Sequence, residues 1–106
     1  MRQGKYIYHV YIMTNKTHST LYVGMTGVGY RRTEQHIMKM FEGFTKKYNV
    51  TKLVYFEEYS YVWDAITREK QIKRWSRKKK EWLIETKNPN WEDLHQKYIQ
   101  HWRSVS

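Results

Sequence analysis

The chain has 106 residues, no cysteine and a formal net charge of +10, from 20 Lys and Arg against ten Asp and Glu. The length predicts a single domain over residues 1–106, and the lack of cysteine excludes disulfides and thiolate metal sites. No apolar run approaches the about 20 residues that span a bilayer, so we expect a cytoplasmic protein with no membrane partner. The positive charge favours a polyanion, above all nucleic acid, and nothing indicates an obligate protein partner.

The first part of the chain predicts a β-hairpin and then a helix. Residues 6–13 are aromatic and β-branched, as a strand prefers, and a polar turn separates them from a second strand over residues 20–25. Three glycines within residues 24–29 are expected to end this hairpin. Residues 30–42 carry apolar side chains at the three- and four-residue spacing that is typical of a helix.

The middle of the chain predicts a third strand and a second helix. A basic loop is expected over residues 43–51, followed by a strand over residues 52–59. Ser60 is a suitable capping residue for a helix over residues 61–75.

The last part of the chain predicts two more helices. Ser76 is expected to begin a helix that continues to about residue 87, where Pro89 prevents its extension. Residues 91–102 predict a final helix. The order is therefore β-β-α-β-α-α with a further helix, which indicates an α+β domain with a small three-stranded, mostly antiparallel sheet flanked by helices.

Glu69 is the first candidate site residue. It lies within the apolar stripe of the helix predicted over residues 61–75, between Ala65 and Ile72. A carboxylate on the inward side of a helix needs a partner, because burying an unpaired charge is costly. The partner is either an arginine at the edge of the core, in a salt bridge, or a hard divalent cation, which prefers oxygen ligands.

Arg32 and His36 are four residues apart and so share one face of the first predicted helix. They could be a solvated surface pair. A guanidinium can also hold a phosphate through two hydrogen bonds, and an imidazole can exchange a proton, so the pair is a second candidate.

Tyr11 and Tyr22 are expected on neighbouring strands, where both could project toward one place, and His9 shares the face of Tyr11. A strand tyrosine usually serves only packing. The glycines after Tyr22, however, would allow a phosphate backbone to approach the sheet.

Basic side chains are the least specific signal, because runs of charge are often solvated helix faces. The residues that we expect to contact nucleic acid are Lys46, Lys47, Lys73, Arg74, Arg77, Lys78 and Lys79. Trp75 and Trp82 stand beside the second run and could stack on exposed bases.

Taken in order, these segments resemble the GIY-YIG nuclease family. The runs that carry the resemblance are HVY at 9–11, YVG at 22–24, YRRTEQH at 30–36, AITREKQIK at 65–73 and NPNW at 88–91. They correspond to the two motifs that name the family, its arginine helix, its glutamate helix and a common C-terminal element. The chain is most similar to the small single-domain bacterial members related to the nuclease domain of the UvrC repair protein.

The resemblance implies a metal-dependent endonuclease that hydrolyses phosphodiester bonds, in DNA rather than RNA, during repair or processing of branched or damaged DNA. It implies that Glu69 holds one Mg²⁺ or Mn²⁺ and that Arg32 steadies the scissile phosphate. One of Tyr11 and Tyr22 would help to activate the attacking water, and the other would position it.

Three further positions follow from the resemblance. His36 would assist the proton network, and Asn88 would lie near the site. His9 stands where the name of the motif has glycine, and its side chain would either crowd the site or join it.

Two other functions remain open. A non-catalytic nucleic-acid-binding module could keep the fold, but binding alone needs no inward carboxylate such as Glu69. An adaptor for an acidic protein would explain the charge and would give no role to the tyrosine pair.

Overall fold

The computed structural model describes residues 6–29, 43, 46–47 and 49–97. Its elements are β1 Tyr6–Thr14, β2 Leu21–Gly29, β3 Lys52–Tyr59, α2 Val62–Arg74 and α3 Arg77–Lys87. The predicted α+β class and three-stranded sheet are confirmed. The helix expected over residues 30–42 and the end of the one expected over residues 91–102 lie outside the described residues.

The sheet has the order β2-β1-β3, and both strand pairs are antiparallel. In this register Tyr11 on β1 stands between Gly24 on β2 and Phe56 on β3. The pairing of β1 with β3 shifts by one residue next to Ile12, so that Val54 is an extra residue in β3.

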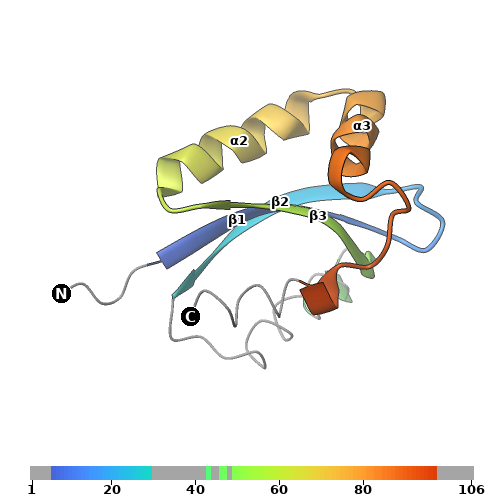
Figure 1. Cartoon of the computed structure of the whole chain (residues 1–106), viewed down its shortest axis with the longest axis horizontal. Helices are drawn as coiled ribbons and strands as arrows, with labels where there is room; N and C mark the ends of the chain where they lie inside the picture. Colours follow the sequence, from blue (N-terminus) through green and yellow to red (C-terminus); the bar gives the residue numbers. More distant parts are fainter. Residues whose placement is uncertain (1–5, 30–42, 44–45, 48, 98–106) are drawn as a thin grey trace.

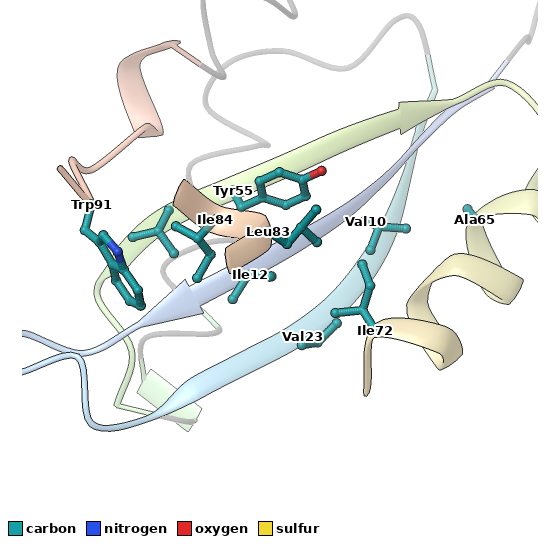
Figure 2. Packing of buried hydrophobic residues seen from close by; sticks show 10 residues of the cluster. Val10, Ile12, Val23, Tyr55, Ala65, Ile72, Leu83, Ile84 and Trp91 are labelled. Atoms are coloured by element: carbon teal, nitrogen blue, oxygen red, sulfur yellow. The ribbon is translucent and has the colours of Figure 1, made fainter. Parts of the chain in front are cut away.

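The helices α2 and α3 lie together on one face of the sheet (Figure 1). Between them and the sheet is a buried cluster formed by Val10, Ile12, Val23, Val54, Tyr55, Ala65, Ile72, Leu83, Ile84 and Trp91, most of which Figure 2 shows. A second buried cluster, Tyr11, Met13, Val50 and Leu53, lies on the opposite face. The alternation of side chains along β1 supplies both clusters, since successive residues point to opposite faces.

Strand β2 is longer than the sequence predicted, because it continues through Gly29 instead of ending near residue 25. The glycines do not end the strand. Gly24 and Gly27 keep pairing with β1, opposite Tyr11 and Tyr8. At Gly24 the lack of a side chain makes room for the ring of Tyr11, so this glycine is needed within the strand.

Two other local predictions were wrong. Residues 43, 46 and 47 have helical backbone where a loop was expected, which suits the helix propensity of lysine. Tyr61, not Ser60, is the N-cap of α2, because the first turn closes on its carbonyl oxygen with hydrogen bonds from the backbone of Asp64 and Ala65.

The start of α3 was predicted correctly. The side-chain oxygen of Ser76 accepts a hydrogen bond from the backbone N–H of Lys79 at 3.2 Å, which caps the helix. None of the described helices is long and apolar enough to cross a membrane.

The segment after α3 passes around the edge of β3. Trp91 packs in the helix-side cluster, whereas Leu94 packs on the opposite face. The backbone N–H of Leu94 donates to the carbonyl of Leu53 at 2.7 Å, and the side chain of Asp93 accepts from the N–H of Leu53 at 3.3 Å. Helical backbone begins only at residue 95, later than the predicted residue 91.

Candidate functional site

Tyr11 and Tyr22 lie together on the sheet face that α2 and α3 leave uncovered. Their ring centroids are 6.3 Å apart and their ring planes are tilted by 42°. Tyr11 is buried and its hydroxyl lies against Gly24, whereas Tyr22 is only half-buried. Of the two hydroxyl groups, that of Tyr22 is therefore better placed to meet a substrate.

His9 belongs to the same face. It is fully buried, and its ring meets the ring of Phe56 edge-on, with centroids 6.0 Å apart. The side chain at this position is thus packed between strands, two residues before Tyr11 on β1.

Glu69 lies on α2 with its side chain 17% exposed, as expected for the edge of an inward stripe. Its carboxylate forms an ion pair with the ammonium group of Lys73 at 3.0 Å, one turn further along α2. The partner is therefore on the same helix and is not an arginine at the core edge. Pairs of this spacing on a helix contribute only about 0.2–0.5 kcal/mol, and the lysine end of this one is half exposed, so a cation could take over the carboxylate at small cost.

The direction of Glu69 follows from that of its neighbour Arg68. Arg68 reaches across to Glu57 on β3, on one flank of α2. Successive residues are about 100° apart around a helix, and the buried residues Ala65 and Ile72 lie between these two flanks. Glu69 is therefore on the flank of α2 over the edge strand β2, which also carries Tyr22.

The structure thus brings together the two tyrosines and His9, and it places Glu69 in the helix layer on the other side of the sheet. Tyr22 projects from one face of the edge strand β2, and Glu69 lies over the opposite face of the same strand. Arg32 and His36 lie outside the described residues, and so their roles stay predictions.

A divalent cation would have few protein ligands here. Among the described residues, no three His, Asp or Glu side chains are grouped as a metal site. Mg²⁺ often takes only one or two carboxylates, and substrate phosphates and water complete its shell. Glu69, whose described ion-pair partner is Lys73 on the same helix, fits a cation of this kind, and it does not fit an all-protein cage.

The basic residues expected to contact nucleic acid differ in their surroundings. Lys46, Lys47, Arg74 and Lys78 are exposed to solvent. Lys73 pairs with Glu69, and the ammonium group of Lys79 lies 4.3 Å from the ring centre of Trp75.

Arg77 has a structural role. Its guanidinium donates to the carboxylate of Glu81 at 2.8 Å, to the carbonyl of Ser19 at 2.8 Å and to the carbonyl of His18. These bonds fasten the β1–β2 loop to α3. The loop is held a second time by Trp91, whose ring stacks on that of His18 with centroids 4.7 Å apart.

Asn88 is also a fastening residue. It is buried, and its amide nitrogen donates to the carbonyls of Val54 and Glu92, both at 2.9 Å. Its side-chain oxygen accepts from the N–H of Glu92 at 3.0 Å. One amide hydrogen therefore joins the end of α3 to β3, and the other joins it to the segment that follows the helix.

A polar cluster that the sequence analysis missed joins β3 to α2. Glu57 accepts hydrogen bonds from Arg68 at 2.9 Å, from Tyr59 at 2.6 Å and from Tyr55. Burial alone would raise the pKa of Glu57, but these bonds outweigh burial and hold its pKa below the ordinary value.

The pKa values of the two tyrosines in this cluster shift in the opposite direction. Burial and the neighbouring Glu57 carboxylate raise the pKa of Tyr59 to about 12, and the same causes raise the pKa of Tyr55. The alternation of Tyr55, Glu57 and Tyr59 along one strand puts all three on one face, and this was the available signal.

Comparison with known families gives one match. The family described as GIY-YIG catalytic domain matches residues 7–82, which is more than half of the chain and includes both tyrosines and Glu69. No curated protein and no solved structure matches the chain.

Proposed function

The chain belongs to the GIY-YIG nuclease family, and from this membership we propose that it is a divalent-metal-dependent endonuclease that hydrolyses phosphodiester bonds in DNA. The observation that carries the proposal is the tyrosine pair, Tyr11 and Tyr22, packed beside Gly24 on strands β1 and β2. Binding alone would not require this pair. The net charge of +10 supports a polyanionic substrate.

Tyr22 is assigned the contact with the attacking water. Tyr22 is half-buried, and its hydroxyl can donate or accept a proton on this face of the sheet, while the buried Tyr11 supports it from the neighbouring strand. Arg32 would hold the scissile phosphate through its guanidinium, and His36 would exchange a proton with the water.

Glu69 is assigned as the protein ligand of one Mg²⁺ or Mn²⁺. When bound, the cation supplies Lewis-acid stabilisation to the charge that develops on the phosphate. Release of Glu69 from Lys73 would leave the lysine, which is half exposed, available for a phosphate oxygen. The exposed cations Lys46, Lys47, Arg74 and Lys78 would add affinity that does not depend on sequence.

The biological setting that we propose is the repair or processing of branched or damaged DNA, which rests on the resemblance to the nuclease domain of UvrC. The test is a panel of labelled single-stranded, duplex, flapped and branched DNA, with RNA of the same forms, incubated at low salt with Mg²⁺, Mn²⁺ or chelator. Cutting that requires the metal supports the nuclease and identifies its preferred substrate.

A non-catalytic nucleic-acid-binding module is the second candidate, and the ion pair between Glu69 and Lys73 is the observation that favours it. In that case every substrate that binds would remain intact with either metal. Binding without cutting across the whole panel would therefore replace the nuclease by the binding module.

A further inference from the structure

The outer face of α2 carries a groove that is separate from the tyrosine face. The groove has a volume of about 610 Å³, and Trp63 and Trp75 lie near its two ends. Between them it is lined by Ile66, Lys70 and Arg74, which recur at four-residue steps on one side of the helix. This side points away from the sheet, since Ala65 and Ile72 occupy the buried side (Figure 2).

Trp63 is 60% exposed. Tyr61 and Trp82 are each 57% exposed, but of these three side chains only Trp63 lines the groove. An exposed ring marks a binding surface when other apolar atoms continue it. Ile66, half-buried in the same groove, continues it here.

The groove is positively charged along its length. The exposed side chains of Lys70 and Arg74 line it, and no carboxylate among the described residues does. At the far end, the guanidinium of Arg68 lies 5.2 Å and the ammonium of Lys79 lies 4.3 Å from the ring centre of Trp75. An aromatic platform with a row of cations fits a chain that offers flat bases and phosphates.

The length of the groove fits a short strand. Trp63 and Trp75 are twelve residues apart, which corresponds to about 18 Å along a helix. At about 3.4 Å per nucleotide, the spacing along one strand of a stacked duplex, this is room for at most about five nucleotides, and for fewer when the strand is extended. A duplex hides the faces of its bases inside the stack, so only unpaired nucleotides could use the exposed ring of Trp63.

We propose that this groove binds a single-stranded segment of the nucleic-acid substrate, with a base stacked on Trp63 and phosphates held by Lys70, Arg74 and Lys79. This inference rests on the proposed function and deepens it, because it assigns to the nuclease a substrate with an unpaired segment. The groove is a second contact, on the outside of the helix layer, and the tyrosine pair lies on the far face of the sheet.

The test separates stacking from charge. Binding of a fluorescent single-stranded 12-nucleotide DNA is compared with binding of an abasic 12-mer that has the same phosphates, at low salt and in chelator. Trp63→Ala should weaken binding of the normal 12-mer about tenfold and leave binding of the abasic 12-mer unchanged. Tyr61→Ala is the matched control, because Tyr61 is 57% exposed, does not line the groove and caps α2 without a side-chain hydrogen bond.

A second variant tests the cations. The double variant Lys70→Ala and Arg74→Ala should weaken both 12-mers and reduce the slope of log affinity against log salt by about 1.4, the value for two phosphates on a single strand. Lys16→Ala, an exposed charge on the β1–β2 loop, should leave the slope nearly unchanged.

Three results would overturn the proposal. The first is an equal loss for the normal and the abasic 12-mer with Trp63→Ala, and the second is an equal loss of binding of the normal 12-mer with Tyr61→Ala. The third is a tenfold loss of poly-glutamate binding with Trp63→Ala, which would assign the groove to an acidic polypeptide.

The experiments distinguish failure of the groove proposal from failure of the proposed nuclease activity. If the wild-type chain cuts nothing but Trp63→Ala selectively weakens binding of the normal 12-mer, the groove proposal is supported and the nuclease activity is contradicted. If the wild-type chain cuts and Trp63→Ala binds both 12-mers like wild type, the nuclease activity is supported and the groove proposal is contradicted.

Discussion

The hydroxyl of Tyr11 lies so close to Gly24, its partner across the β1–β2 pair, that a Cβ at residue 24 would stand 2.6 Å from it. The same Cβ would stand 2.8 Å from the ring carbon that bears the hydroxyl. Tyr11 is buried in the core on this face and cannot turn away freely. The glycine of the second motif is therefore explained by the tyrosine of the first.

Gly24→Ala should accordingly destabilise the fold. The added methyl overpacks a filled site, and we expect the free energy of unfolding to fall by about 1–3 kcal/mol. The measurement is urea unfolding followed by circular dichroism.

Gly43→Ala is the matched control. Nothing lies within 4 Å of a Cβ at this position, where the backbone is helical. Alanine there should leave stability unchanged or raise it by about 0.5–1 kcal/mol. Equal stability of Gly24→Ala and the wild type would show that the ring of Tyr11 is not fixed against Gly24.

The two motif tyrosines should differ in catalysis, because their exposure differs. Tyr22→Phe removes the hydroxyl of a half-buried side chain. This change should lower the cleavage rate by about 100-fold or more, without weakening DNA binding in chelator. Tyr11→Phe removes a buried hydroxyl and should change the rate by less than about tenfold. Single-turnover cleavage rates decide this, and a larger loss from Tyr11→Phe would reverse the assignment.

The Glu57 cluster predicts how stability depends on pH. The pKa of Glu57 is lower in the folded chain than its ordinary value of 4.5, so its contribution is present above about pH 4.5 and is lost as the pH falls through the folded value. The pKa values of Tyr55 and Tyr59 are raised, so their contribution is present below pH 10.0 and is lost as the pH rises, toward about 12 for Tyr59.

Glu57→Gln tests this dependence. The variant should lose about 1–3 kcal/mol at neutral pH, because Arg68 keeps no charged partner there, and its stability should fall less steeply below pH 4.5. Glu81→Gln removes a more exposed carboxylate and should cost less than about 1 kcal/mol. Unfolding curves at a series of pH values would contradict the account if the wild type and Glu57→Gln lost stability in parallel below pH 4.5.

Asn88 should matter for folding and little for chemistry. Asn88→Ala removes three side-chain hydrogen bonds, one buried and two partly buried, and should lower the free energy of unfolding by about 2–4 kcal/mol. Asn90→Ala, an exposed change in the same turn, should stay within about 0.5 kcal/mol of wild type. A large fall in cleavage per folded molecule with unchanged stability would instead return Asn88 to the catalytic site.

Much of the fold was predictable because its signals are local. The β-branched and aromatic run of β1, the bounds of β3 and the Ser76 cap of α3 all depend on neighbouring residues. The end of β2 was not predictable in this way. A glycine ends a strand or continues it according to what lies across from it, and at Gly24 that is the ring of Tyr11.

The candidate site was predictable only in its parts. Strand alternation indicated that Tyr11 and Tyr22 would converge, and the helical stripe indicated that Glu69 would be partly buried. The pair of Glu69 with Lys73 was available from their four-residue spacing on one helix. That Arg77 binds the β1–β2 loop, in contrast, depends on how the helix layer packs on the sheet. Charge runs in a sequence do not reveal which cations are already engaged.

The central claim is that Glu69 is the metal ligand of a nuclease, and the most direct measurement compares Glu69→Gln with Glu81→Gln in a metal-dependent cleavage assay. We predict that Glu69→Gln loses more than about 100-fold in cleavage rate. We also predict that it unfolds within about 1 kcal/mol of wild type and binds DNA in chelator like wild type. Glu81→Gln should cut normally. Cleavage by Glu69→Gln at the wild-type rate would contradict the claim, and so would loss of cleavage together with loss of folding.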